Sequence, residues 1–295
     1  MNVTAQMWGR TALLMARGRV NIANFRAYSG EAPRNAELLK GRVCLVTNCD
    51  VRRSHYLPNE IANSLAEYGA TVMVHGVDDD VVEELAKSLP TPLGSTQKHG
   101  YVECDGQTGR SPVKAAEKIY EQLQERTDHL DVLVNNAGTV DVPPVGMDEY
   151  AVDEFDRVVR LDLTNPFALV KKLVPLLAKG KASKIILTST EVDFPRDTDK
   201  GLVVGGAYYV SQFGFRASSM LTKLMARELH SRRIQVNTVD PGRVFLFKTP
   251  KEIPHDSDRT IPYVWLARAN TKMTGEQLDV KDWLRRDPSM FTRGY

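Results

Sequence analysis

The histidines and cysteines are the side chains that could bind a metal or form a redox centre. The chain has six histidines and three cysteines among its 295 residues. Cys44, Cys49 and Cys104 contain no pair at the spacing of a metal site, and three thiols cannot all be paired with one another. The histidines also lack ligand spacing. The sequence therefore predicts no metal site and no disulfide framework, and it favours a reducing compartment.

Two adjacent arginines, Arg52 and Arg53, introduce a different chemistry, because a guanidinium group can bind phosphate through charge and paired hydrogen bonds. They follow residues 42–47, a short apolar run that is typical of a buried parallel strand. Asp78 and Asp79 follow a second such run and would favour a ribose hydroxyl over a 2′-phosphate if a dinucleotide binds. The alternative for the arginine pair is a solvated loop without a ligand.

Strands and helices alternate along the chain and must position these side chains. Apolar, β-branched runs predict strands at residues 42–47, 71–75, 101–104, 130–134, 184–188 and 234–239. Helical spacing predicts helices at residues 58–68, 80–89, 111–126 and 213–230, and a further long helix before the strand at residues 184–188. Parallel strands joined by helices of this length indicate right-handed crossovers. The expected fold class is α/β, a doubly wound parallel sheet in a single Rossmann-type domain.

Three motifs carry a resemblance to a known family. Residues 133–138 read LVNNAG, residues 236–242 read VNTVDPG, and residues 273–280 read MTGEQLDV. These segments resemble the NNAG, Pro-Gly and Thr-Gly motifs of the short-chain dehydrogenase/reductase family. Asp105 matches the acidic residue that the family places near the adenine. The resemblance covers residues 40–283 and implies a fold that binds NAD(P).

The resemblance also implies which residues would form the site. The family's catalytic Asn, Ser, Tyr and Lys fall on Asp162, Thr190, Tyr208 and Gln212. The family's cofactor-binding positions fall on Asn48, Arg52, Arg53, Asp78, Asp105, Asn135, Asn136, Ala137, Gly138, Pro241 and Gly242. Among the four catalytic positions, only the tyrosine is unchanged.

The changes at the catalytic positions oppose proton transfer by Tyr208. Its phenol must exchange a proton near neutral pH, although an ordinary tyrosine has a pKa of ~10. The family lysine helps through its charge, whereas Gln212 is neutral and Asp162 brings a negative charge. One unit charge ~6 Å away at an effective dielectric of ~20 is worth about 3 kcal/mol. We therefore expect a poor acid or base, unless Asp162 is protonated or a cation lies nearby.

Two other family features are absent from the sequence. The family motif Thr-Gly-x-x-x-Gly-x-Gly lets the backbone approach the cofactor pyrophosphate at a helix N-terminus. No glycine occurs between Gly41 and Gly69, and Tyr56 and Pro58 stand where two glycines are expected. The segment at residues 242–275 is short and rich in proline, which leaves little chain for the family's substrate-binding insertion.

Three hypotheses for the function follow. The leading prediction is a catalytically impaired mitochondrial protein that acts as a scaffold or accessory subunit, with no cofactor or only vestigial NAD(P). The second is a divergent NAD(P)-dependent reductase of a carbonyl such as a 3-oxoacyl group. The third is a module that binds a dinucleotide without turnover. The family's dimer-forming helices, which correspond to residues 155–179 and 208–230, imply a homo-oligomer or binding to subunits of a mitochondrial complex.

Residues 1–28 have the composition of a mitochondrial transit peptide, with four arginines, no acidic residue and interspersed apolar side chains. Residues 26–29 resemble a processing site cut after Tyr28, so we expect the mitochondrial matrix, with an ordinary basic tail as the alternative. Cleavage would change the net charge from +2 to −2 and leave no basic excess for nucleic acid. No apolar run approaches the ~20 residues that span a bilayer. Residues 29–39 are expected to be a linker and residues 284–295 a C-terminal tail.

Overall fold

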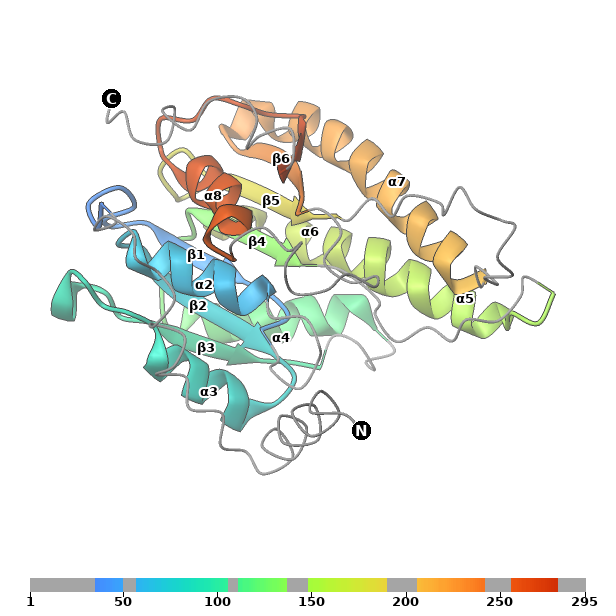
Figure 1. Ribbon diagram of the computed structural model, residues 1–295, viewed down its shortest axis with the longest axis horizontal. Coiled ribbons are helices and arrows are strands. Elements are labelled where there is room, and N and C mark those ends of the chain that lie inside the picture. The colour runs from blue at the N-terminus through green and yellow to red at the C-terminus, as the bar shows by residue number, and fades with distance from the viewer. Residues whose placement is uncertain are drawn as a thin grey trace, which may run out of the picture. The chain divides into compact units, whose positions relative to one another are not determined.

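The computed structural model of the protein describes residues 35–49, 57–105, 111–136, 148–189, 206–241 and 256–280. Seven parallel strands in these ranges form one sheet in the order β3-β2-β1-β4-β5-β6-β7 (Figure 1). Their bounds are β1 Val43–Val46, β2 Thr71–Gly76, β3 Gly100–Glu103, β4 Val132–Asn136, β5 Lys184–Thr188, β6 Gln235–Asp240 and β7 Gln277–Asp279. The order reverses between β1 and β4, which is where doubly wound sheets bind ligands at the carboxyl ends of the strands. The predicted fold class is confirmed.

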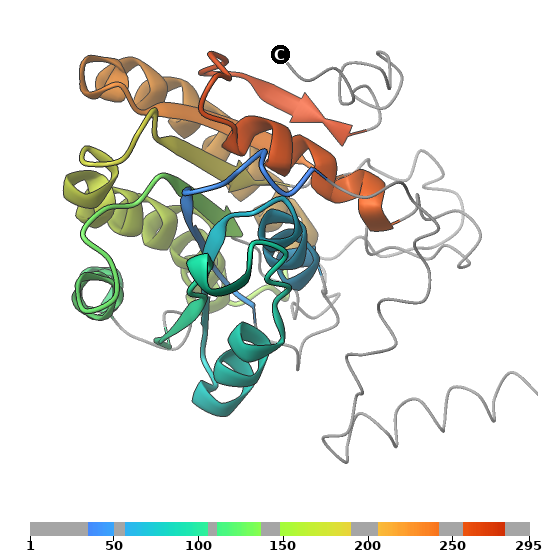
Figure 2. The same cartoon turned by 90° about the vertical axis from the view of Figure 1, so that its left-hand side faces the viewer.

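Helices cover both faces of the sheet (Figure 2). Their bounds are α2 Leu57–Glu67, α3 Asp79–Ser88, α4 Pro112–Gln124, α5 Val152–Val159, α6 Asn165–Leu177, α7 Gly206–Glu228 and α8 Asp256–Ala267. Shorter turns are η2 Gly94–Thr96, η3 Arg160–Thr164 and η5 Leu229–Arg232, of which η3 is a π-helical turn. Helices α2, α3 and α8 pack on one face, and α4, α6 and α7 pack on the other.

Alternate residues of each strand point into one of two apolar cores. On β4, Val132 and Val134 belong to the core under α2 and α8, whereas Leu133 belongs to the core under α4 and α6. All of these side chains are fully buried, which explains why the strands read as continuous apolar runs. Since side chains alternate along a strand, the next two residues, Asn135 and Asn136, face opposite sides of the sheet.

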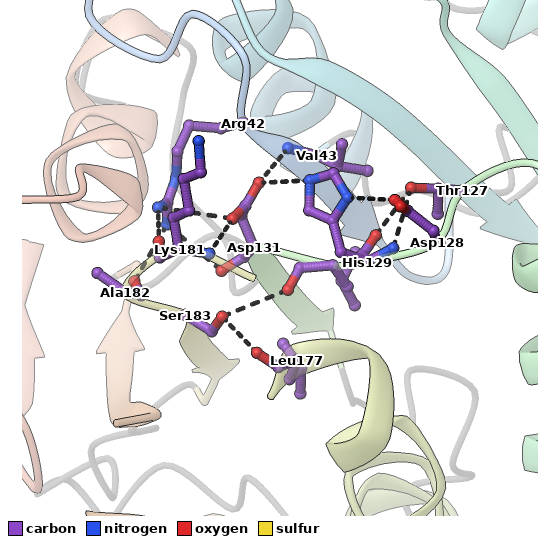
Figure 3. Close-up of polar contacts among 11 residues, drawn as sticks. Arg42, Val43, Thr127, Asp128, His129, Asp131, Leu177, Lys181, Ala182 and Ser183 are labelled. Carbon is purple, nitrogen blue, oxygen red and sulfur yellow. Dashed lines mark hydrogen bonds and ion pairs between the residues drawn. The ribbon is translucent and has the colours of Figure 1, made fainter. Parts of the chain in front are cut away.

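At the amino-terminal ends of the strands, the carboxylate of Asp131 connects neighbouring segments of the sheet (Figure 3). This carboxylate accepts hydrogen bonds from the backbone N–H groups of Val43 at 2.9 Å and Lys181 at 2.7 Å. The guanidinium of Arg42 lies 3.9 Å from it and donates to the carbonyl groups of Asp131 and Ala182, each at 3.3 Å. These bonds join β1, β4 and the residues that lead into β5, so the amino-terminal edge is closed by protein groups.

Candidate functional site

Three polar side chains interlock where β1 and β4 end. The backbone N–H of Asn136 donates to Oγ1 of Thr47 at 2.9 Å, and Nδ2 of Asn136 donates to the Thr47 carbonyl at 3.1 Å. Oδ1 of Asn135 can only accept, so the hydroxyl proton of Thr47 is donated to it, at 3.1 Å. All three residues are buried, so both amides have a fixed orientation at the expected ligand-binding edge.

Asn48 makes the turn that leaves β1. Its φ is +59°, a left-handed conformation that glycine adopts freely and that asparagine tolerates better than other residues. Its Nδ2 donates to the carbonyl of Asn136. Asn48 follows Thr47, as the first glycine follows threonine in the family motif, so asparagine makes a left-handed turn where that glycine is missing.

His75, at the end of β2, supports the same turn. The backbone N–H of Asn48 donates to Nδ1 of His75 at 3.4 Å, and Nε2 of His75 lies 3.0 Å from the carbonyl of Cys104. A carbonyl can only accept, so Nε2 carries the proton. Burial lowers the pKa of His75 to about 4, which keeps the imidazole neutral at neutral pH. This role of His75 could not be predicted from local sequence patterns, because it depends on a contact between two strands.

A cavity of about 60 Å³ opens beside this cluster, between the strand ends and helices α4 and α6. Its polar side is formed by Thr47, Asn48, His75, Asn135, Asn136 and Asn165, and apolar residues of α4, η3 and α6 form the rest. The described residues that line it are all uncharged at neutral pH. Nδ2 of Asn135 is buried without a hydrogen-bond partner. The cavity therefore offers a buried amide donor to a neutral acceptor, such as water or a polar ligand group.

Two of the predicted cofactor-binding acids lie at the same edge. Asp78 caps α3, because its Oδ1 accepts from the backbone N–H of Val81 at 3.3 Å. Asp105 is the second residue after β3, and the residue between them, Cys104, donates its backbone N–H to the Gly76 carbonyl at 3.0 Å. The carboxylate of Asp78 thus has a structural role in addition to any contact with a ribose.

Asp162, the residue at the family's asparagine position, is buried in the π-helical turn η3. In that turn the N–H of Asn165 donates to the carbonyl of Arg160, five residues earlier. Pro166 has no N–H, so it cannot donate to the carbonyl of Asp162 as an α-helix would require. Oγ of Ser218, from α7, donates to that carbonyl instead, at 3.3 Å. π-turns inside helices occur frequently at functional sites.

Helix α7 carries the two remaining catalytic positions that the structure describes. The backbones of Tyr208 and Gln212 lie in its first two turns, about one turn apart. The helix contacts both α5 and η3. The fold therefore brings the segment of Asp162 beside the helix of Tyr208, as the resemblance implied.

The remaining predicted site residues are Pro241 and a group that lies outside the described residues. Pro241 is buried immediately after β6. The predicted residues Arg52, Arg53, Ala137, Gly138, Thr190 and Gly242 lie outside the described residues, as does Tyr56. Their assignment stays a prediction.

The described ranges contain no group of three histidine, cysteine or acidic side chains that could hold a metal. No helix in the same ranges is long and apolar enough to cross a membrane. All three cysteines are buried free thiols, and burial raises the pKa of Cys44 to about 12 and that of Cys49 still further. These two thiols therefore stay protonated and unreactive.

Comparisons with known proteins agree with this geometry. The family model described as "short chain dehydrogenase" matches residues 57–255. The chain is 30% identical over 205 residues to the 3-oxoacyl-[acyl-carrier-protein] reductase FabG of Aquifex aeolicus, covering 69% of this chain and 74% of that protein. It is 27% identical over 251 residues to the uncharacterized oxidoreductase YciK of Escherichia coli, covering 81% and 92%.

Solved structures show the same fold. The structure of the oxidoreductase yciK from E. coli matches with a TM-score of 0.68 and 23% identity, over 86% of this chain and all of that one. A short chain dehydrogenase from E. coli CFT073, complexed with NADPH, matches with a TM-score of 0.68 and 24% identity, over 83% and 99%.

Two predictions are wrong in the light of these comparisons. The leading prediction was a catalytically impaired scaffold or accessory subunit, but the relatives are named as reductases and oxidoreductases, which favours the second hypothesis. The prediction of no cofactor, or only vestigial NAD(P), is contradicted by similar structures that hold NADPH or NADP. Part of the physical reason is Asn48, which adopts a left-handed turn at the position of the family's first glycine although it is not glycine.

Proposed function

Because this chain belongs to the short-chain dehydrogenase/reductase family, we propose that it is an NAD(P)-dependent reductase of a carbonyl substrate. The observation that carries the proposal is the oriented cluster of Thr47, Asn135 and Asn136 at the switch point between β1 and β4. This is the place where doubly wound sheets hold a dinucleotide.

The residues at this edge fit such a cofactor. Asn48 provides the left-handed turn after β1, and the buried Nδ2 of Asn135 is a donor that a ligand acceptor would satisfy. Asp105 stands at the family position near the adenine. Bound there, the nicotinamide cofactor supplies the hydride that reduces the substrate carbonyl.

Tyr208 would donate the proton that the substrate oxygen needs when its carbonyl carbon is reduced. The hydroxyl of Thr190 would bind the same oxygen, and the amide of Gln212 would bind a ribose hydroxyl without contributing charge. Asp162 would stand beside this relay, held by the π-turn and by the bond from Ser218.

A 3-oxoacyl group is the substrate class that the relatives support. FabG of A. aeolicus and the rhamnolipids biosynthesis 3-oxoacyl-[acyl-carrier-protein] reductase of Pseudomonas aeruginosa, 26% identical over 228 residues, are both named for this reaction. The test is oxidation of NADH or NADPH by the purified protein in the presence of a 3-oxoacyl thioester. Tyr208→Phe should abolish turnover, while Tyr209→Phe, the same change one residue on, should retain it. Equal turnover in both variants would overturn the role of Tyr208, and no turnover in the wild type would count against the function.

We also propose that the protein is a homo-oligomer. Helices α5, α6 and α7 expose large apolar side chains at Phe155, Phe167, Met220 and Leu224. Exposed apolar groups of this size favour an interface, and these are the helices that form the family's dimer. Light scattering of the Met220→Lys, Leu224→Lys double variant should show a smaller species than the wild type.

The mitochondrial matrix is our proposal for the location. Its support is the arginine-rich, acid-free composition of residues 1–28. Fusion of these residues to a reporter should direct it to mitochondria, and replacing the four arginines by glutamine should prevent this. Import of both fusions, or of neither, would contradict the proposal.

A further inference from the structure

Helix α8 reaches the candidate site through one buried tyrosine. Tyr263 is fully buried, and its hydroxyl lies 3.0 Å from Oγ1 of Thr188, the last residue of β5. Oγ1 of Thr188 in turn donates to Oδ1 of Asn136 at 2.7 Å. A line of two hydrogen bonds therefore joins α8 to the amide at the end of β4.

The direction of these bonds follows from the groups themselves. Oδ1 of Asn136 can only accept, so the single proton of Thr188 is donated to it. Thr188 then has only lone pairs left, so Tyr263 must donate its own proton to Thr188. Burial raises the pKa of Tyr263 well above its ordinary value, so its hydroxyl keeps that proton.

Both polar atoms of the Asn136 side-chain amide are therefore hydrogen-bonded. Thr188 donates to its Oδ1, while its Nδ2 donates to the carbonyl of Thr47. A flipped amide would point Oδ1 at the Thr47 carbonyl, where two acceptors would face each other. The backbone carbonyl of the same residue accepts from Nδ2 of Asn48, so the amide and the left-handed turn are parts of one unit.

We propose that Thr188 and Tyr263 are positioning residues for the dinucleotide: they fix the amide of Asn136, and through it the turn at Asn48 against which the cofactor binds. The inference rests on the proposed cofactor binding. Neither residue was among the predicted site residues, and Tyr263 acts from the α2 and α8 side of the sheet, where Figure 1 shows α8 beside α2.

The test compares the substitution of threonine by valine at two buried positions, Thr188 and Thr222. Thr188→Val removes a buried hydroxyl from the line, and Thr222→Val removes a buried hydroxyl that bonds Thr238 at 2.6 Å, away from Asn136. Both should lower the melting temperature. Only Thr188→Val should also raise the Kd for the dinucleotide, by about five- to tenfold, which corresponds to one lost hydrogen bond. Tyr263→Phe should raise this Kd by a smaller factor, and Thr188→Ser, which keeps the hydroxyl, should have a Kd close to that of the wild type.

A second readout needs no cofactor. The side-chain NH₂ resonances of Asn136 in a ¹H–¹⁵N spectrum should shift or broaden in Thr188→Val and Tyr263→Phe, and stay unchanged in Thr222→Val. Unchanged Kd and unchanged resonances in the first two variants, with a wild type that binds dinucleotide, would overturn this proposal alone. A wild type that binds none of NAD⁺, NADH, NADP⁺ and NADPH would overturn the proposed cofactor binding, and this inference with it.

Discussion

Glu60 and Arg259 form an ion pair in which one guanidinium nitrogen, Nη2, lies 3.0 and 2.9 Å from the two carboxylate oxygens. Each side chain is only 8% exposed. Glu60 belongs to the first turn of α2 and Arg259 to the first turn of α8, so the pair joins the starts of two neighbouring helices. The carboxylate of Glu60 also lies at the positive end of the α2 helix dipole, where a negative charge is favourable.

Loss of one partner of this pair should be costly. Arg259→Met removes the guanidinium from the buried Glu60 carboxylate, so we expect the free energy of unfolding to fall by about 3–5 kcal/mol. The double variant Glu60→Met, Arg259→Met should lose less stability, because both charges of the pair are removed together. Urea denaturation of both variants measures the difference, and a double variant that is less stable than Arg259→Met would contradict this account.

Lys184 should make stability depend on pH above neutrality. The side chain is buried, and it donates to the carbonyl of Thr271 at 2.5 Å and to Oε1 of Gln235. Burial first, and then the charge of Arg42, lower the pKa of Lys184 to about 8 from 10.5. Between those two pH values the unfolded chain binds more protons than the folded one, so the free energy of unfolding rises with pH across that window.

Lys184→Met removes this titration. Between pH 8 and pH 10.5 the free energy of unfolding of the wild type should rise by on the order of 3 kcal/mol relative to that of the variant. Denaturation at several pH values measures the gain. Parallel pH profiles for the two proteins would show that Lys184 titrates normally.

Asn48 should tolerate glycine better than alanine. Alanine in its left-handed conformation costs about 1–2 kcal/mol and also removes the amide bond to Asn136, whereas glycine loses only that bond, about 1 kcal/mol. Asn48→Gly should therefore be the more stable variant in chemical denaturation. Arg233 is a control, since it has the same φ of 59° at an exposed turn, and Arg233→Gly should be neutral or stabilising. Equal stability of the two Asn48 variants would argue against a role for the left-handed turn.

Restoring the family's charges at the catalytic positions should increase the rate. Asp162→Asn removes a negative charge and Gln212→Lys adds a positive one, and both changes favour ionisation of a nearby tyrosine. With about 3 kcal/mol for a charge at ~6 Å, we expect kcat to rise by about 10- to 100-fold at neutral pH. Asp156→Asn, an exposed site on α5, is the control for net charge. An equal effect of the control variant would show that the change is not local.

Local patterns were enough to predict the sheet. The strand at residues 184–188 was predicted with its observed bounds, because its three central residues are apolar and the segment is buried on both faces. The helix predicted at residues 155–179 is instead divided into α5, η3 and α6. Its apolar spacing concealed the break that Pro166 makes by withholding one backbone donor.

The candidate site was only partly predictable. Asn135 and Asn136 follow from the NNAG motif, and the structure places both beside Thr47. The roles of His75, Thr188 and Tyr263 could not be predicted, since each depends on a partner from another element. A histidine or tyrosine among apolar residues has no local pattern that distinguishes a hydrogen-bonded role from ordinary core packing.

The π-helical turn at Arg160–Thr164 holds one residue more than an α-helical turn would. One residue corresponds to about 100° of rotation about a helix axis, so this turn sets the phase of α6 relative to α5. Leu169 and Leu173 then face α4 in the core. A single-residue deletion here would remove the extra residue and rotate that apolar stripe off its partner. A one-residue gap at this place in an alignment would therefore mark a change of helix phase rather than the loss of a side chain.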